Sequence, residues 1–194
     1  MEEDRGQAMA LRLDRAARRA GLAGQADRIG EAVRAVLHHR RPAFPDDHHP
    51  DFLHPARTAL ILLEDLNVAD ADLLLAALLR DSERPALDLS ADMAARIAGS
   101  RAAAIAESLP DAGLDPADRL EALVTLDDDA LMVALAERLD HARHLHLQPS
   151  ERWADFHDGI SRADLPAASR TNARLAWRIQ WWHDNFARRF LHTR

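Results

Sequence analysis

The chain contains no cysteine and no lysine. The lack of cysteine excludes disulfide frameworks, thiolate metal sites and cysteine nucleophiles. All 25 basic residues are therefore arginines, whose planar guanidinium groups stay charged and suit carboxylates and phosphates. Any chemistry must rest on histidine, aspartate, glutamate and arginine.

The sequence also lacks an apolar stretch long enough to cross a bilayer, and it has no run of basic residues. Its first residues, MEEDRGQAMALRLDRAARRAG, are acidic and then amphipathic, which is not the basic-then-apolar order of a secretion signal. The net charge of -7 argues against a nucleic-acid partner. We therefore expect a cytoplasmic protein without a membrane or nucleic-acid partner.

Few glycines and no alternation of apolar with polar residues argue against a sheet, whereas alanine, leucine, arginine and glutamate favour helices. We predict an all-α fold, and the length fits a single domain, residues 1–194. The predicted helices cover residues 4–20, 25–38, 54–66, 70–81 and 166–191, and others begin at Ser90, near Arg101 and at the acidic run 127–129. Prolines at 42, 45 and 50 predict a loop over residues 40–53, and a turn is predicted at 110–116.

Residues 150–194 form a predicted helical extension of this domain. On its last helix one stripe is apolar, which indicates a core face or a dimer face; its members are Leu175, Ile179, Trp182, Phe186 and Phe190. A homo-oligomer formed through the C-terminal helix is therefore one expectation.

Histidines are concentrated in two places. Of the 11 in the chain, five lie between residues 38 and 54 and three between 141 and 146. Glu137, His141 and His144 are spaced i, i+4, i+7 and share one helix face. This spacing is what metal ligands or an acid/base pair require, and it is also that of an ordinary helix-stabilising pair.

Three segments rich in apolar and charged residues follow one another along the chain: HPARTALILLEDL from residue 54, LAALLRDSER from residue 75 and LAERLDHARHL from residue 135. In this order they resemble the motifs of the HD superfamily of metal-dependent phosphohydrolases. More narrowly, the chain resembles the hydrolase domain of RelA/SpoT-type enzymes, which remove pyrophosphate from the stringent-response alarmone (p)ppGpp. The likeness covers residues 30–147 or so and implies an HD-domain-like helical bundle.

The resemblance assigns metal ligands. His54 and Asp81 match the family's first and third ligands, and Glu137 stands at its final carboxylate position. The implied cofactor is a divalent metal, manganese, if the site functions, and otherwise none. Arg80 stands where the family has its second histidine, and His141, His48 or His49 is the expected source of the missing nitrogen.

The resemblance also assigns catalytic and substrate-binding residues. The family's acidic pair would fall on Arg84 and Pro85, so Glu83 and Arg84 are the nearest catalytic candidates. The implied substrate or ligand is a guanine nucleotide polyphosphate or a related small molecule. Its phosphates would be bound by Arg40, Arg41 and Arg138.

The arginine at position 80 predicts that a guanidinium group, and not a metal ion, neutralises the carboxylates of the site. A guanidinium has no lone pair for a metal and repels a nearby cation by several kcal/mol at about 5 Å. We expect Arg80 to place its fork between Asp81 and Glu137, where it would replace the ion and leave hydrolysis weak or absent.

Three functions are therefore open. The chain could be a degenerate HD domain that binds a nucleotide polyphosphate or a partner without cleaving it. It could instead be an active phosphohydrolase that uses a substitute ligand. The third reading is a helical interaction module with Trp177, Trp181 and Trp182 as anchors.

Overall fold

A computed structural model describes residues 4–46, 48–111 and 113–191 of the chain. Over these residues it contains helices and no strands, which confirms the predicted all-α class. The α-helices are α1 (Arg5–Arg19), α2 (Ala26–Arg40), α3 (His54–Leu60), α4 (Ala71–Leu79), α5 (Ala91–Ala98), α6 (Ser100–Ser108), α7 (Pro116–Thr125), α8 (Asp128–His144), α9 (Trp153–Gly159), α10 (Leu165–Ala168) and α11 (Ala173–Phe186). Short π-helical turns extend three of them, at Ile61–Asp65 after α3, at Ile160–Asp164 after α9 and at Ala187–Leu191 after α11.

Helix α4 forms the centre of the N-terminal half. All of its residues from Leu73 to Leu79 are buried, and it contacts α2, α3, α5, α6 and α8. Such an all-round apolar helix is stable only when neighbours cover every face. Asp70 begins the helix by accepting hydrogen bonds from the backbone amides of Asp72 and Leu73.

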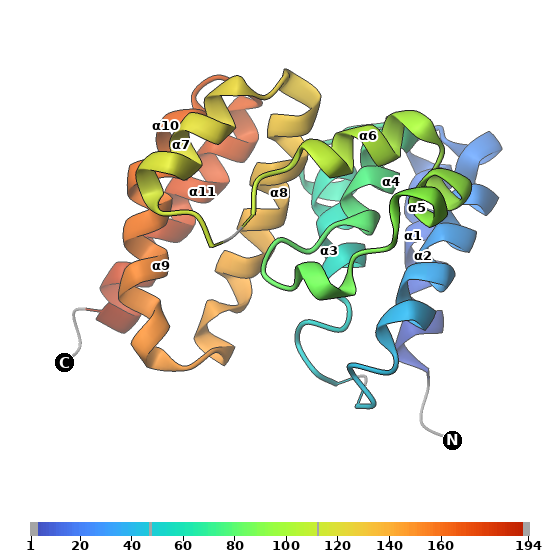
Figure 1. Ribbon diagram of the computed structural model, residues 1–194, viewed down its shortest axis with the longest axis horizontal. Coiled ribbons are helices and arrows are strands. Elements are labelled where there is room, and N and C mark those ends of the chain that lie inside the picture. The colour runs from blue at the N-terminus through green and yellow to red at the C-terminus, as the bar shows by residue number, and fades with distance from the viewer. Residues whose placement is uncertain (1–3, 47, 112, 192–194) are drawn as a thin grey trace.

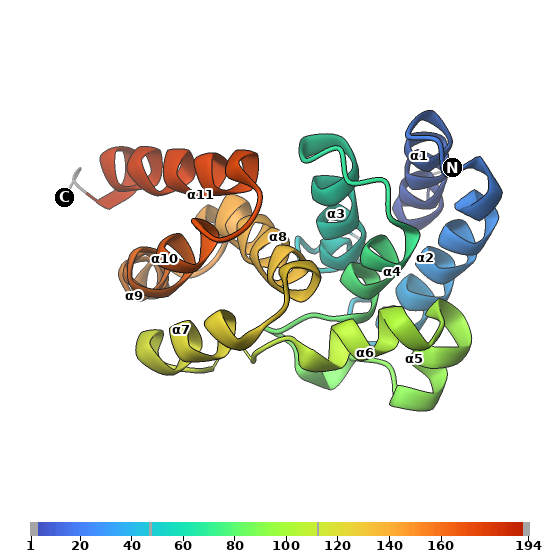
Figure 2. The same ribbon diagram turned by 90° about the horizontal axis from the view of Figure 1, so that it is seen from above.

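Helix α8 joins the two halves of the molecule. Helices α1 to α6 lie on one side of it and α7, α9, α10 and α11 lie on the other (Figure 1, Figure 2). It packs against α3 and α4 on one side and against α7 and α11 on the other. Its residues 133–140 are buried without interruption, including three charged side chains: Glu137, Arg138 and Asp140.

The structure corrects several predicted boundaries. The last helix does not run unbroken from 166 to 191, because a turn at residues 169–172 separates α10 from α11. Asn172 causes the restart, since its side chain accepts hydrogen bonds from the amides of Arg174 and Leu175. Helix α4 ends at Leu79, two residues early, and helix α7 lies outside the set of predicted helices.

The apolar stripe of the last helix is a core face. Leu175, Ile179, Trp182 and Phe186 are buried against the rest of the chain, and Phe190 is partly buried. Trp182 is therefore a core residue and not a surface anchor, whereas Trp177 and Trp181 are 61% and 55% exposed. Homo-oligomer formation through this helix stays a prediction. Within the described residues, no helix has the combination of length and apolar character that crossing a membrane requires.

Candidate metal centre

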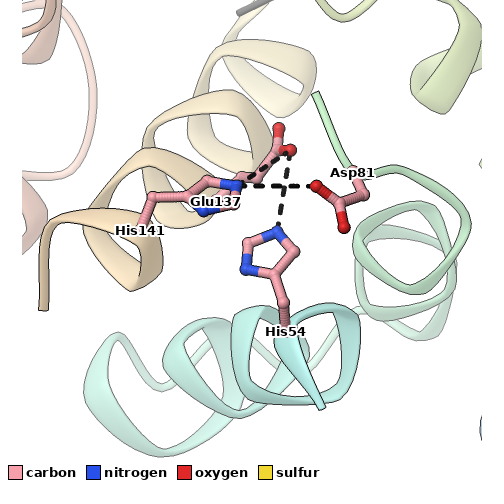
Figure 3. Close-up of side chains that lie close together, drawn as sticks. All are labelled: His54, Asp81, Glu137 and His141. Atoms are coloured by element: carbon pink, nitrogen blue, oxygen red, sulfur yellow. Dashed lines mark ion pairs between the residues drawn. The ribbon is translucent and has the colours of Figure 1, made fainter. Parts of the chain in front are cut away.

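Four acidic and histidine side chains meet where α3, α4 and α8 come together (Figure 3). His54 is the first residue of α3, and Asp81 lies two residues after the end of α4. Glu137 and His141 lie one turn apart on α8. One donor atom from each of the four lies within 4.8 Å of the others. The sequence-predicted ligands His54, Asp81, Glu137 and His141 are thus brought together.

The donor atoms face one another without touching. Glu137 Oε1 lies 3.7 Å from His54 Nε2 and 3.9 Å from His141 Nε2. His141 Nε2 lies 3.7 Å from Asp81 Oδ1. These distances exceed those of a hydrogen bond. His54 Nε2, His141 Nε2 and Asp81 Oδ1 are accordingly buried polar atoms without a hydrogen-bond partner.

This arrangement fits a divalent metal ion. Donor atoms around a four-coordinate ion with bonds of about 2.1 Å lie about 3.4 Å apart. The three distances above are slightly longer, and every pair of donor atoms lies within 4.8 Å, so the side chains would close in on a bound ion. Two imidazole nitrogens and two carboxylate oxygens form a mixed donor set that suits manganese, iron or zinc. Buried polar atoms nearly always have a partner, so three unpartnered ones around one point indicate a shared cation.

A second layer of contacts orients His54. Its Nδ1 lies 2.8 Å from Asp140 Oδ2. Arg57 in turn donates to both oxygens of Asp140, and its Nη2 lies 2.8 Å from Oδ2. The outer ring nitrogen of a metal-binding histidine usually has a carboxylate or carbonyl partner of this kind, which directs the other nitrogen at the metal.

The two carboxylates of the centre are also held in place. The backbone amide of Ser82 donates to Glu137 Oε1. Arg40 donates to Asp81 Oδ2 at 2.6 Å, and both side chains are about 1% exposed. Asp81 therefore keeps one oxygen for its arginine and leaves Oδ1 turned towards His141.

The charged groups of the cluster strongly shift one another's pKa values. Burial opposes protonation of His54, but its hydrogen bond to Asp140 and the nearby carboxylates of Glu137 and Asp81 raise its pKa to about 10. Burial alone would raise the pKa of Glu137, but the nearby histidines hold it well below its usual value. The pKa of Asp140 is lowered as well, because contacts with His54 and Arg57 outweigh its burial. A metal ion would therefore have to displace a proton from His54.

The prediction for Arg80 is wrong. Its guanidinium pairs with Asp88 at 2.6 Å and with Asp111, and it does not lie between Asp81 and Glu137. The reason is local, because α4 ends at Leu79 and Arg80 has extended backbone angles. Its side chain thus leaves the helix towards the loop that carries Asp88.

Arg40 and Arg41 are also misplaced as phosphate-binding residues. Arg40 is buried and paired with Asp81 and the backbone oxygen of Asp51, so it serves as an internal counter-ion. Arg41 pairs with Asp4 and lines a different hollow, between α1 and α2. Arg40 ends α2 and Arg41 follows it with helical backbone angles, so the two side chains point about 100° apart.

The other site candidates lie beside the cluster. A cavity of about 180 Å³ opens next to His141, and Glu83 and Arg84 both line it. Arg84 is paired there with Asp51 at 2.8 Å. Arg138 lines a neighbouring cleft instead, and its guanidinium binds Glu83 and Asp164.

The loop histidines do not reach the centre. His48 contacts Arg5, and His49 packs against the ring of Phe44 and accepts a hydrogen bond from the amide of Asp51. His141 is the one candidate nitrogen that the described structure adds to the cluster.

Three residues of the site were missed from the sequence: Arg57, Asp140 and Arg152. Helical spacing offered a signal for two of them. Asp140 follows Glu137 by three residues on α8, and Arg57 follows His54 by three residues on α3. Arg152, which lines the cavity and pairs with Glu83, carried no such signal.

Fold and cluster together define an all-α protein with a candidate metal centre. No family model matches the chain, and neither a curated protein nor a solved structure matches it. The resemblance to the HD superfamily therefore stays a prediction that rests on three sequence motifs.

Proposed function

We propose that the chain is a metal-dependent phosphohydrolase of the HD type, with a divalent transition metal bound by His54, Asp81, Glu137 and His141. One observation carries this proposal: three buried, unpartnered donor atoms surround one point together with Glu137 Oε1. His141 supplies the nitrogen that Arg80 cannot give. In this proposal the second histidine ligand comes from α8 and not from the end of α4.

A divalent ion in this place would lower the pKa of a bound water and polarise a phosphoryl oxygen. The protein's own residues would place the substrate. The cavity beside His141 is lined by Arg57, Arg84 and Arg152, whose guanidinium groups suit phosphate oxygens. Glu83 lies in the same wall, paired with Arg152 at 3.2 Å. A phosphate that bound Arg152 would break this ion pair, and Glu83 Oε2 could then accept a proton.

The substrate we propose is a nucleotide polyphosphate of the (p)ppGpp class. This assignment rests on the motif resemblance and on the arginines of the cavity. With a volume of about 180 Å³, the cavity is smaller than the ~300–1,000 Å³ typical of pockets that enclose a whole drug-sized ligand. It would accept the phosphates and leave the nucleoside outside.

Metal binding is tested first, by titrating chelator-treated protein with manganese and following its thermal unfolding. Binding to the folded state alone raises the unfolding midpoint. We expect His141→Ala to remove this shift and His39→Ala, which changes an exposed histidine on α2, to retain it. Equal shifts in the two variants would place the metal elsewhere.

Hydrolysis is tested by measuring pyrophosphate release from (p)ppGpp in the presence of manganese. We expect release by the unaltered protein and none by the His141→Ala variant. A metal-loaded protein that releases no pyrophosphate would refute the phosphohydrolase on this substrate while leaving the metal site intact.

A second candidate, nucleotide binding without hydrolysis, has one observation in its favour. Glu83, the carboxylate nearest to the positions of the family's acidic pair, is held by both Arg138 and Arg152. If that clamp persists with the substrate bound, Glu83 is not free to accept a proton from the attacking water. Calorimetry that detects (p)ppGpp binding, together with a lack of pyrophosphate release, would favour this candidate.

A further inference from the structure

A second cleft lies between α7, α8 and α9, on the other side of the Glu83–Arg152 ion pair. Its volume is about 600 Å³, within the range of small-molecule sites. The floor is charged and one wall is apolar. The residues that matter here are Leu114, Pro116, Arg119, Arg138, Phe156 and Gly159.

Positive charge exceeds negative charge at the floor of this cleft. Arg119 and Arg138 are 4% and 8% exposed, and they share a single fully buried carboxylate, that of Asp164. Arg119 donates to one oxygen of Asp164 and Arg138 to the other. Arg138 also binds Glu83, but Glu83 is paired with Arg152 as well. Three guanidinium groups thus share two carboxylates.

One N–H edge of each buried arginine is left over. Arg119 Nη1 and Arg138 Nη2 have no acceptor within the part of the chain that the structure describes. The other side of the Arg138 guanidinium is fixed, because its Cζ lies 3.7 Å from the centroid of the Phe156 ring. Burying a cation without full pairing is costly. Burial, together with the charge of Arg119, lowers the pKa of Arg138 below its ordinary value.

Gly159 allows the Arg138 guanidinium to lie close to α9. A Cβ atom at position 159 would lie 3.2 Å from Arg138 Nη2, tighter than nine in ten real contacts of this kind. A side chain at this position would therefore force the guanidinium to shift. Leu114 and Pro116, at the start of α7, supply the apolar wall beside it.

We propose that this cleft binds a small oxyanion, a phosphate or a phosphomonoester, between Arg119 and Arg138. An organic part of the ligand would pack against Leu114 and Pro116. The rim of the cleft carries exposed charges of both signs, and one pair of them, Arg162 and Asp158, forms an ion pair. This site is separate from the four residues of the proposed metal centre, and it shares Glu83, Arg152 and Phe156 with the cavity beside His141.

The test uses chelator-treated full-length protein labelled with ¹⁵N at its 7 glycines, titrated with inorganic phosphate and followed by NMR. We expect the Gly159 amide signal to move and to saturate. Signals of Gly6, in the hollow beside Arg41, and of Gly99 should stay in place. A second titration, with phenyl phosphate, shows whether an organic group strengthens binding. A Gly159 signal that does not respond to either ligand at millimolar concentration would overturn the proposal.

Charge variants locate the site independently. Leu114→Glu places a carboxylate in the wall of the cleft at a position that is 37% exposed, so we expect the fold to persist. Phosphate affinity should fall about tenfold through repulsion. Leu11→Glu, at a position of α1 that is 49% exposed, makes the same change far from the cleft and should leave affinity unaltered. Equal affinities in the two variants would contradict binding at this cleft.

Discussion

Arg40 gives the most quantitative prediction about the candidate centre. Its guanidinium donates to Asp81 Oδ2 at 2.6 Å, and both side chains are about 1% exposed. Removing one partner of such a pair leaves the other as an uncompensated buried charge, at a cost of about 3–5 kcal/mol. We therefore expect Arg40→Met to lower the free energy of unfolding of the metal-free protein by about that amount.

The assay is urea unfolding of chelator-treated protein. The neighbouring variant Arg41→Met is the matched control, because the side chain of Arg41 is 40% exposed and pairs with the exposed Asp4. Its effect should stay below about 1 kcal/mol. Manganese should restore part of the stability lost in Arg40→Met, since a bound cation would also neutralise Asp81.

A double variant completes this test. When Asp81→Asn is added to Arg40→Met, the buried carboxylate charge disappears, and the loss should be clearly smaller than the sum of the single losses. If Arg40→Met destabilises the protein no more than Arg41→Met does, Arg40 is not the internal counter-ion and the description of Asp81 is wrong.

Four further outcomes are expected. Asp140→Asn should weaken manganese affinity about 10–100-fold in a calorimetric titration, because Asp140 orients His54, and unchanged affinity would show that it does not. Arg80→His should leave manganese affinity within about threefold of the original, since the side chain points towards Asp88 and not into the cluster. A large gain in affinity would show that residue 80 points into the cluster, as predicted from the sequence. The pKa of His54 is raised to about 10, so its stabilising contribution to the metal-free protein is complete below pH 6.5 and is lost as the pH rises towards 10. Urea midpoints measured across that interval should fall, and manganese binding at pH 7 should release about one proton. Asn172→Ala should cost about 1 kcal/mol in unfolding free energy through loss of the N-cap of α11, and an effect near zero would argue against that cap.

Much of the helix pattern was predictable because it depends on local signals. Asp70 and Asn172 both cap helices, yet only the start of the helix after Asp70 was predicted. The apolar stripe begins only at Leu175, so it carries no information on residues 166–172, where the structure has a turn and the N-cap Asn172. Sequence periodicity shows which residues share a face, but it does not show where a helix restarts.

The candidate site was also predictable only in part. Glu137 and His141 share a face of α8 through spacing alone, and the motif order added His54 and Asp81. The partner of each arginine could not be predicted, because it depends on tertiary contacts. Arg40 reaches Asp81 across 41 positions of the sequence, and Arg80 turns away because its backbone is extended. An arginine's place in a motif therefore does not determine which carboxylate it binds.

The central claim is that His54, Asp81, Glu137 and His141 share one metal ion. Diffraction from crystals soaked in manganese, recorded on both sides of the manganese absorption edge, tests it directly. We predict an anomalous peak in contact with His54 Nε2, Asp81 Oδ1, Glu137 Oε1 and His141 Nε2. A cluster without such a peak, in which protonated His54 closes onto Glu137 at hydrogen-bond distance, would contradict the claim.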